Sequence, residues 1–288
     1  MKTKLRKIFF MEIIIAKNAG FCFGVKRAVE MAEKALGKGR KVYCLGSLIH
    51  NRQVIEKLEQ KGLVTVKAPA EIPAGSVFLV RSHGIDPEIV EEIVARGGEI
   101  LDATCPFVRR AQRVAKKFHD ENYAVVICGD PNHAEVLGIN AWAKNSAKII
   151  HDADEIKNLE FQCAVGVLSQ TTQKKELFDN VVRELTKKTK NLVIENTICL
   201  DSSTKQAEVS ALAKKVDLMI VIGGKNSSNT GKLVELSKAQ KIPTYHIETA
   251  AELQKDWFQT AQKVGIAAGA STAQFLIDEV VDKIKILC

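Results

Sequence analysis

One strand–turn–helix pattern occurs three times along this chain, and this repeat constrains the fold more than any other feature of the sequence. In each copy a short β-branched segment leads into a turn with a cysteine, and a segment with apolar residues at helical spacing follows. The three turns contain Cys22, Cys105 and Cys199. A second strand then ends in another turn, 28 residues after the cysteine, at His50, His133 and Ser227. Agreement of this kind across three copies indicates a threefold internal repeat.

A third strand–turn–helix segment completes each copy. The segments read SVFLVRSHG, CAVGVLSQTT and KVGIAAGAST, and short connectors with Glu71, Glu155 and Glu252 precede them. Strands that alternate with helices predict parallel sheets with helices on both faces. We therefore expect an α/β protein of three domains, residues 12–104, 105–198 and 199–288, related by a pseudo-threefold axis in a trefoil. Because ligands bind beyond the carboxyl ends of parallel strands, the turns would converge on one central site.

Three cysteines in one repeat position could supply three thiolates to a single metal centre. Each precedes an expected helix, whose positive N-terminal end favours the thiolate. Three further cysteines, Cys44, Cys128 and Cys163, fit buried positions in strands or at a strand start. Zinc would need a fourth ligand or a water, whereas an iron–sulfur cubane on three cysteines keeps one iron without a protein ligand. An open iron suits reductive chemistry, and the residues alone leave both metals open.

A second set of polar residues lies in the turns at the expected carboxyl ends of strands: His50, His83, His133, Thr171, Ser227, Ser228, Asn229 and Ser271. Hydroxyl, amide and imidazole donors at helix N-termini form anion sites, so a phosphate or diphosphate is the expected ligand. The absence of a P-loop and of G-x-G-x-x-G after a strand disfavours nucleotides. Glu135 is the one carboxylate beside a histidine in these turns. It is either a partner of the helix dipole or, beside a metal site, a general acid.

The charge balance and composition narrow the class of protein. Lys and Arg number 42 against 34 Asp and Glu, a net charge of +8 that favours an acidic partner or an anionic substrate. No basic stripe accompanies the 11 Phe, 3 Tyr and 2 Trp, so nucleic-acid binding is not expected. No apolar run reaches the roughly 18 residues of a membrane span. Seven cysteines without a C-x-x-C pair indicate a reducing cytoplasm. The basic segment from Lys2 to Lys7 is expected to lead into a strand at 13–16, and Met11 could be the functional start.

The motifs GFCFGVKRA, DATCP, NHAEVLG, SQTT and KNSSN, in this order, resemble the 4-hydroxy-3-methylbut-2-enyl diphosphate reductase family from about residue 12 to the end. The resemblance implies a trefoil around a central [4Fe–4S] cluster on Cys22, Cys105 and Cys199, with one open iron. It also implies that His50, His83, His133, Ser227, Asn229 and Ser271, with Ser228 beside them, hold a diphosphate. Glu135 would deliver protons, Thr171 would position the substrate alcohol, and His133 belongs to the catalytic set.

The implied reaction is a two-electron, two-proton removal of an allylic hydroxyl as water, which gives isopentenyl and dimethylallyl diphosphates in the methylerythritol phosphate route. Electrons in this family come from ferredoxin or flavodoxin, small acidic carriers that are compatible with a charge of +8. Two functions of other classes are kept as alternatives. One is a non-enzymatic iron–sulfur redox sensor or diphosphate-binding protein on the same scaffold, and the other is a three-cysteine zinc hydrolase of phosphoesters.

This chain departs from the family pattern in three places. The third cysteine motif, usually C-x-A-T-x-x-R-Q, reads CLDSSTKQ here and differs at Asp201, Ser202 and Lys205. A carboxylate at Asp201 is expected to make a nearby cluster harder to reduce, because its charge opposes an incoming electron. Ala273 follows GAST where proline is common, and little effect on chemistry is expected. The ten residues before Met11 are additional to the usual start.

Overall fold

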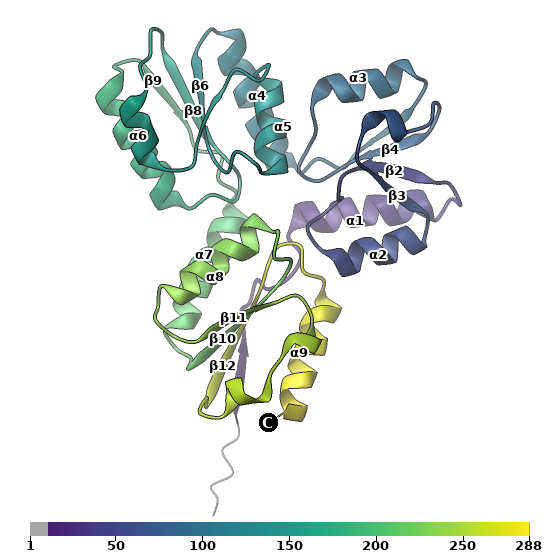
Figure 1. Ribbon diagram of the computed structural model, residues 1–288, viewed down its shortest axis with the longest axis vertical. Helices are drawn as coiled ribbons and strands as arrows, with labels where there is room; N and C mark the ends of the chain where they lie inside the picture. Colours follow the sequence, from purple (N-terminus) through teal and green to yellow (C-terminus); the bar gives the residue numbers. More distant parts are fainter. Residues whose placement is uncertain (1–10, 288) are drawn as a thin grey trace, which may run out of the picture. The chain divides into compact units, whose positions relative to one another are not determined.

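The computed structural model describes residues 11–287 (Figure 1), so the expectation for the basic segment from Lys2 to Lys7 lies outside the described residues. The chain divides into two compact units. One is Cys22–Ser203, and the other combines Thr204–Cys288 with the chain up to Phe21. Each unit is described separately below. In the described part of the chain, no helix is both long and apolar enough to cross a bilayer.

The first sheet of the Cys22–Ser203 unit has four parallel strands in the order β3-β2-β4-β5. The strands are β2 (Val42–Leu45), β3 (Leu63–Val66), β4 (Val77–Val80) and β5 (Glu99–Asp102). The helices of this part are α1 (Phe23–Leu36), α2 (Arg52–Gln60) and α3 (Pro87–Ala95). Phe78 and Val80 of β4 pack with Ile93 of α3 in one buried cluster, because alternate strand residues face the same side.

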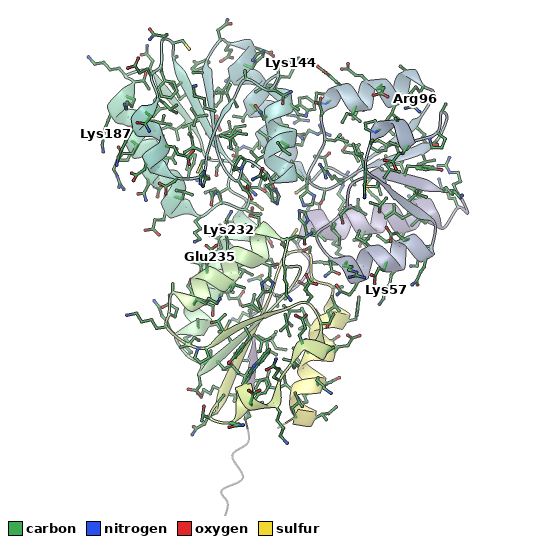
Figure 2. The ribbon with its side chains drawn as sticks, in the orientation of Figure 1. Lys57, Arg96, Lys144, Lys187, Lys232 and Glu235 are labelled. Atoms are coloured by element: carbon green, nitrogen blue, oxygen red, sulfur yellow. The ribbon has the colours of Figure 1, made fainter. Side chains whose placement is uncertain are left out.

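The second sheet of this unit repeats the arrangement in the order β7-β6-β8-β9, again all parallel. Its strands are β6 (Ala124–Cys128), β7 (Lys148–Ile150), β8 (Val165–Ser169) and β9 (Leu192–Glu195). Its helices are α4 (Pro106–Asp120), α5 (Ala134–Trp142) and α6 (Lys175–Lys188). Phe118 of α4 and Ile139 of α5 share a core on one face, and Val181 of α6 packs on the other. An exposed ion pair between Lys144 and Glu88, 3.2 Å long, connects the end of α5 to α3 (Figure 2).

The other compact unit contains the third sheet, with the order β1-β12-β10-β11. Its strands are β1 (Glu12–Ile15), β10 (Leu218–Ile222), β11 (Thr244–Ile247) and β12 (Lys263–Ala268). The helices are α7 (Leu200–Ala213), whose first turn belongs to the Cys22–Ser203 unit, α8 (Ser228–Lys238) and α9 (Gln274–Leu287). Leu212 of α7 and Leu233 of α8 pack on one face, and Val280 of α9 packs on the other.

The three sheets therefore have one strand order, which confirms an α/β protein built from three parallel-sheet repeats. In each of the first two sheets, one of the two edge strands leads into the next cysteine turn. This strand is β5 in the first sheet and β9 in the second. In the third sheet β1 takes the corresponding place by pairing with β12. The strand expected to open the domain at residues 12–104 thus lies in the sheet of the C-terminal unit.

The connectors before the third strand of each repeat have one capping arrangement. Each is a 3-10 turn, η1 (Pro69–Glu71), η2 (Ala153–Asn158) or η3 (Ala250–Glu252), and its glutamate accepts backbone N–H groups at the start of the turn. The donor–acceptor distances are 2.7 Å from Ala68 to Glu71, 2.9 Å from Asp152 to Glu155, and 3.1 Å from Thr249 to Glu252. This shared contact is independent support for the repeat.

Two of the three expected buried cysteines are buried, and one is not. Cys44 in β2 and Cys128 at the end of β6 are fully buried. Cys163 is exposed, so its expected burial was wrong. It lies in a bend two residues before Val165 begins β8, outside the strand whose residues are all buried.

Gly166→Ala tests the packing of α4 on the second sheet. A Cβ at Gly166 would lie 2.5 Å from the ring of Phe118, which is itself buried. We expect this overpacking to lower the free energy of unfolding by about 1–3 kcal/mol. The matched control is Gly231→Ala in α8, where a Cβ would meet nothing within 4 Å. Alanine there should be neutral or stabilising by up to about 1 kcal/mol. Thermal unfolding of both variants would show this, and equal melting temperatures would contradict it.

Candidate active site

The three repeat cysteines occupy equivalent places in front of helices. Cys22 and Cys105 are the N-cap residues of α1 and α4, and Cys199 directly precedes α7. The Sγ of Cys22 accepts a hydrogen bond from the N–H of Val25 at 3.4 Å. Thiolates gain stability at this end of a helix because free N–H groups point toward them. All three cysteines are partly buried and none forms a disulfide, so all three thiols are available as ligands.

Burial and mutual repulsion oppose ionisation of these thiols when no cation is present. Burial is the largest cause that raises the pKa of Cys22, to about 11; the Val25 N–H lowers it, and Asp201, Cys105 and Cys199 add to the rise. Burial likewise raises the pKa values of Cys105 and Cys199, and the charge of Glu135 adds to both. Three such thiols would be stabilised as thiolates by a shared positive group.

The three repeat thiols leave the kind of metal centre open. Among the described residues, no group of three or more His, Cys, Asp or Glu side chains is placed to hold a metal ion. A mononuclear site needs all of its sulfurs about 2.3 Å from one metal. In a cubane cluster each cysteine binds a different iron, so the three sulfurs need not meet at one point. Gly24 supports this close packing of turns, because a Cβ there would lie 2.5 Å from the Sγ of Cys105.

Backbone hydrogen bonds connect the cysteine turns to neighbouring polar turns in the same unit. The N–H of Cys105 donates to the carbonyl of Ser82 at 3.0 Å, next to His83. The N–H of Cys199 donates to the carbonyl of Thr171 at 2.8 Å. Each bond joins the turn after an edge strand to the turn after the adjacent strand. The predicted cysteine turns and the predicted polar turns therefore meet at the carboxyl ends of the strands in each sheet.

Three histidines from two sheets form one cluster in the Cys22–Ser203 unit. The ring centroids of His50 and His83 are 4.3 Å apart, and His133 lies 5.4 Å from His50 and 5.7 Å from His83. The Nδ1 of His83 is buried and has no hydrogen-bond partner among the described residues. Burial lowers the pKa of His50 to about 4 and lowers that of His83 as well. The rings of His50 and His83 are therefore neutral near pH 7, with N–H groups that can donate to an anion.

Arg81 is a functional candidate that the sequence analysis missed. It follows β4 directly and precedes His83 by two residues. Its guanidinium donates to the Gly84 carbonyl at 3.2 Å, and its positive charge lowers the pKa values of His50 and His83. Gly46, at φ +68°, leaves room for it, because a Cβ there would lie 2.8 Å from Nη1 of Arg81. A basic residue directly after a strand that leads to a predicted anion-binding histidine was the available signal.

Glu135 lies in the first turn of α5 and is only 2% exposed. Its Oε1 accepts the N–H of Thr171 at 2.6 Å, and its Oε2 accepts the Thr171 hydroxyl at 2.8 Å. The N–H of Glu135 donates to Nδ1 of His133 at 3.1 Å, so Nδ1 acts as the acceptor and the N–H of this ring is on Nε2. The structure thus joins the three residues predicted to be catalytic. The charge of Glu135 also acts on Cys105 and Cys199.

The remaining predicted residues lie in the other compact unit, at the carboxyl edge of its sheet. Ser227 is the N-cap of α8, and its Oγ accepts the N–H of Thr230 at 3.3 Å. Asn229 and Ser271 are buried beside the turns that follow β10 and β12. Ser228, in the first turn of α8, accepts a hydrogen bond from Lys232 at 3.1 Å. Each of these residues occupies the strand-end turn that the repeat predicted.

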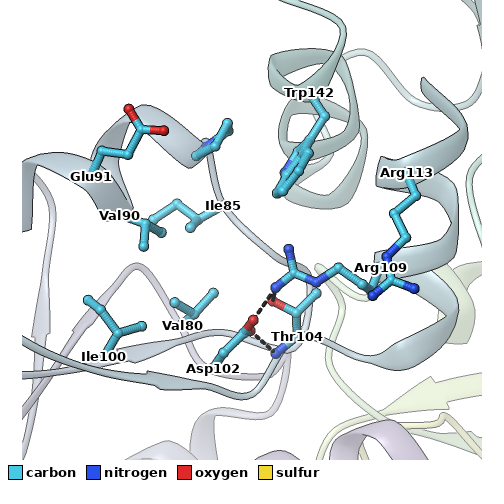
Figure 3. A pocket seen from close by; sticks show the side chains of 11 residues that line it. Val80, Ile85, Val90, Glu91, Ile100, Asp102, Thr104, Arg109, Arg113 and Trp142 are labelled. Carbon is cyan, nitrogen blue, oxygen red and sulfur yellow. Dashed lines mark hydrogen bonds and ion pairs between the residues drawn. The ribbon is translucent and has the colours of Figure 1, made fainter. Parts of the chain in front are cut away.

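A cavity of about 460 Å³ lies near the Cys105 turn but is lined by none of the predicted site residues (Figure 3). At its edge Asp102 pairs with Arg109 and accepts the N–H of Thr104 at 2.9 Å. Arg109 in turn lies over the ring of Trp142, 5.4 Å from its centre. These contacts fix the segment that leads from β5 to Cys105, so residues of the cavity wall help to position the Cys105 turn.

Three parallel sheets of one strand order, with cysteine turns joined to a histidine cluster and a buried carboxylate, are the features of an α/β iron–sulfur protein. The sequence model of the LytB protein family matches residues 13–285, and the chain belongs to that family. Membership implies an iron–sulfur cluster in general terms.

Curated relatives have a more particular name. The 4-hydroxy-3-methylbut-2-enyl diphosphate reductase of Geobacter sulfurreducens is 45% identical over 275 residues, which cover 96% of this chain and 97% of the relative. The protein of the same name from Clostridioides difficile is 44% identical, over 94% of this chain and 98% of the relative.

Solved structures agree with these relatives. The E-1-hydroxy-2-methyl-but-2-enyl-4-diphosphate reductase of Plasmodium falciparum matches with a TM-score of 0.90 at 27% identity, over 96% of this chain and 87% of that chain. A second structure, described as (E)-4-hydroxy-3-methyl-but-2-enyl diphosphate reductase, the terminal enzyme of the non-mevalonate pathway, matches with a TM-score of 0.69 at 41% identity. It covers 96% of this chain and 100% of that chain.

The histidine cluster predicts a pH dependence of stability. The folded pKa of His50 is about 4 and its ordinary value is 6.5, so between these values the unfolded chain binds a proton that the folded chain does not. Stability therefore falls as the pH falls through this window. From pH 7 to pH 5 we expect His50 to account for a loss of roughly 1–2 kcal/mol.

Urea unfolding of the wild type and of His50→Gln at both pH values measures this contribution. The difference between the two pH values should shrink in His50→Gln. The exposed His151, replaced by Gln, is the matched control. A pH dependence in His50→Gln equal to that of the wild type would contradict the prediction.

Proposed function

We propose that this protein reductively removes the allylic hydroxyl of 4-hydroxy-3-methylbut-2-enyl diphosphate and yields isopentenyl and dimethylallyl diphosphates with water. Two electrons and two protons enter for each hydroxyl that leaves. The names of the relatives support this reductase function and give no support to a redox sensor or a zinc hydrolase. The observation that carries the proposal is the buried Glu135 carboxylate, held by Thr171 within electrostatic range of two repeat cysteines.

Cys22, Cys105 and Cys199 would hold a [4Fe–4S] cluster with one iron that has no protein ligand. When bound, this cluster would supply electrons and a Lewis-acidic iron for the substrate hydroxyl. The partly buried, disulfide-free thiols in front of three helices fit this role, since they share a need for positive charge. Gly24 supports the fit because it lets one cysteine turn approach another.

The diphosphate group would be bound by His50, His83 and His133 in the Cys22–Ser203 unit. Their neutral rings donate N–H groups, and the Arg81 guanidinium, which has no carboxylate partner among the described residues, adds positive charge. In the other unit we assign Ser227, Ser228, Asn229 and Ser271 to the same diphosphate. Hydroxyl and amide donors at the start of α8 and after β12 suit an anion for the reason given for helix N-termini.

Glu135 would hold and deliver the protons of the reaction. Thr171 contacts it through both N–H and hydroxyl, so the hydroxyl can pass a proton between the carboxyl group and a substrate alcohol. His133 caps the same helix and fixes the backbone at Glu135. Burial of Glu135 excludes water from the proton donor, which reduces loss of protons to solvent.

Four further parts of the proposal complete the setting. Ferredoxin or flavodoxin would be the electron donor, and the reaction would take place in the cytoplasm. Neither a nucleic acid nor a membrane would be a partner. The three-domain division at residues 12–104, 105–198 and 199–288 would correspond to the three sheets, with β1 exchanged into the third sheet as described.

The decisive experiment is metal and substrate analysis of protein purified without oxygen. We expect about four irons and four sulfides for each chain and a visible spectrum that changes when the hydroxymethylbutenyl diphosphate is added. Reduction with a viologen dye should then give both prenyl diphosphates. Zinc alone, or a colourless protein that cannot be reconstituted with iron and sulfide, would overturn the proposal.

Glu135→Gln tests the proton donor. The amide keeps the size of the side chain but cannot deliver a proton, so turnover should fall by about 10²- to 10⁴-fold. Iron content and substrate binding should survive. Glu88→Gln is a matched control, because Glu88 lies in the first turn of α3 as Glu135 lies in that of α5. If both variants turn over at the wild-type rate, Glu135 has only the helix-dipole role.

A further inference from the structure

Three large apolar side chains are exposed within two residues after the three repeat cysteines. Phe23 follows Cys22 and is 64% exposed, Phe107 lies two residues after Cys105 and is 40% exposed, and Leu200 follows Cys199 and is 74% exposed. The described residues contain nine large exposed hydrophobic side chains, and one of them lies at the start of the helix that follows each repeat cysteine. All three lie in the Cys22–Ser203 unit. Surface residues scattered at random would not be expected to follow all three cysteines.

The turns that precede these side chains lie close to one another. A Cβ at Gly24, the residue after Phe23, would lie 2.5 Å from the Sγ of Cys105, so the first turn of α1 lies against the Cys105 turn. The charge of Cys199 acts on both Cys22 and Cys105, and each apolar residue is only one or two positions from its thiol. Helix first turns favour acidic or small polar residues, so apolar residues there require another reason. Neither the proposed cluster ligation nor diphosphate binding uses Phe23, Phe107 or Leu200.

Basic residues accompany two of the three apolar residues. Lys26 lies one helical turn after Phe23, and Arg110 lies one turn after Phe107, so each pair shares a helix face. Lys26 reaches Glu30 only at 4.0 Å, and Arg110 lies 3.1 Å from Glu195, with all four side chains substantially exposed. Exposed pairs of this kind contribute little and are readily exchanged for a partner's carboxylates. On α7 the charge is instead the Asp201 carboxylate, so the basic part of this surface belongs to α1 and α4.

We propose that Phe23, Phe107 and Leu200, with Lys26 and Arg110, form the docking surface for a small acidic carrier protein that delivers single electrons. The inference rests on the proposed reductase function, which needs two electrons from outside the chain. Each docking event would oxidise one carrier by one electron and reduce the protein by one, so two events serve one product. Apolar residues beside the thiols give contact at the shortest distance from the cluster ligands. The basic residues steer an acidic partner, as is typical of small, transient redox interfaces.

The test measures binding and turnover separately on anaerobic holoenzyme. Oxidised flavodoxin is titrated by calorimetry into the wild type, Phe23→Ser/Leu200→Ser and Lys26→Glu/Arg110→Glu. We expect at least about fivefold weaker binding for each double variant, and a smaller effect of salt for the charge variant. Turnover is then measured with reduced flavodoxin and with reduced methyl viologen, a dye that needs no docking surface. The KM for flavodoxin should rise, while the rate with the dye and the iron content stay within about twofold of the wild type.

Matched control variants are available elsewhere on the surface. Val94 and Ile286 are 54% and 78% exposed. The side chain of Lys187 on α6 (Figure 2) is 62% exposed, close to the 68% of Lys26, and it also pairs with a glutamate of its own helix. Val94→Ser/Ile286→Ser and Lys187→Glu should bind flavodoxin as the wild type does. Wild-type affinity in the docking variants, or a wild type that binds neither flavodoxin nor ferredoxin, would overturn the docking surface. A wild type without activity even with the dye would instead overturn the reductase function.

Discussion

The hydrogen bond from a cysteine N–H to the neighbouring turn is the contact on which the site depends. Cys105 donates to Ser82 and Cys199 donates to Thr171, in each case across the carboxyl edge of a parallel sheet. Parallel pairing places successive strand ends at one edge, and this bond fixes one turn against the other. Each of these two cysteines, proposed as cluster ligands, is thereby held beside the turn of His83 or of Thr171, which are proposed to act on the substrate. The repeat places a cysteine in each of these turns, and the parallel pairing of the strands places each turn beside another turn with candidate site residues.

The electrostatic design of the site follows from burial. The thiols resist ionisation because burial and mutual repulsion raise their pKa values. The histidines resist protonation because burial and Arg81 lower theirs. The thiol region therefore favours a positive occupant, and the histidine region, which includes the Arg81 charge, favours a negative occupant. The proposed iron–sulfur cluster and diphosphate would suit these two regions, because burial keeps water from screening the attraction.

The sequence predicted the features that recur in the three repeats. It did not predict contacts that occur in only one of the repeats. The cysteine slots, the His50 and His133 turns and the glutamate-capped connectors all follow a fixed spacing, so their strand-end positions could be read in advance. The exchange of β1 into the third sheet could not, because it depends on which edge the last repeat leaves unpaired. Arg81 was missed because its effect on His50 and its place beside Gly46 involve a turn distant in the sequence. The exposure of Cys163 depends on a bend outside any strand. The exposure of Phe23, Phe107 and Leu200 is likewise a property of the folded surface, since their apolar character alone suggests burial.

The departures in the third cysteine motif acquire a physical meaning from the structure. Lys205 is buried and donates to the carbonyls of Asn18 and Gly20, in the segment that leads to Cys22, while Glu208 accepts the N–H of Asn18. The lysine thus keeps a positive group at this position, and the loop is held from α7. Asp201 acts in the opposite direction, since its charge raises the pKa values of Cys22 and Cys199. A negative charge that opposes thiolates would also oppose an electron added to the proposed cluster, so the proposed reaction would need a strongly reducing donor. The proposed docking surface would meet that need, because electron transfer from a separate protein requires close contact with the cysteine turns.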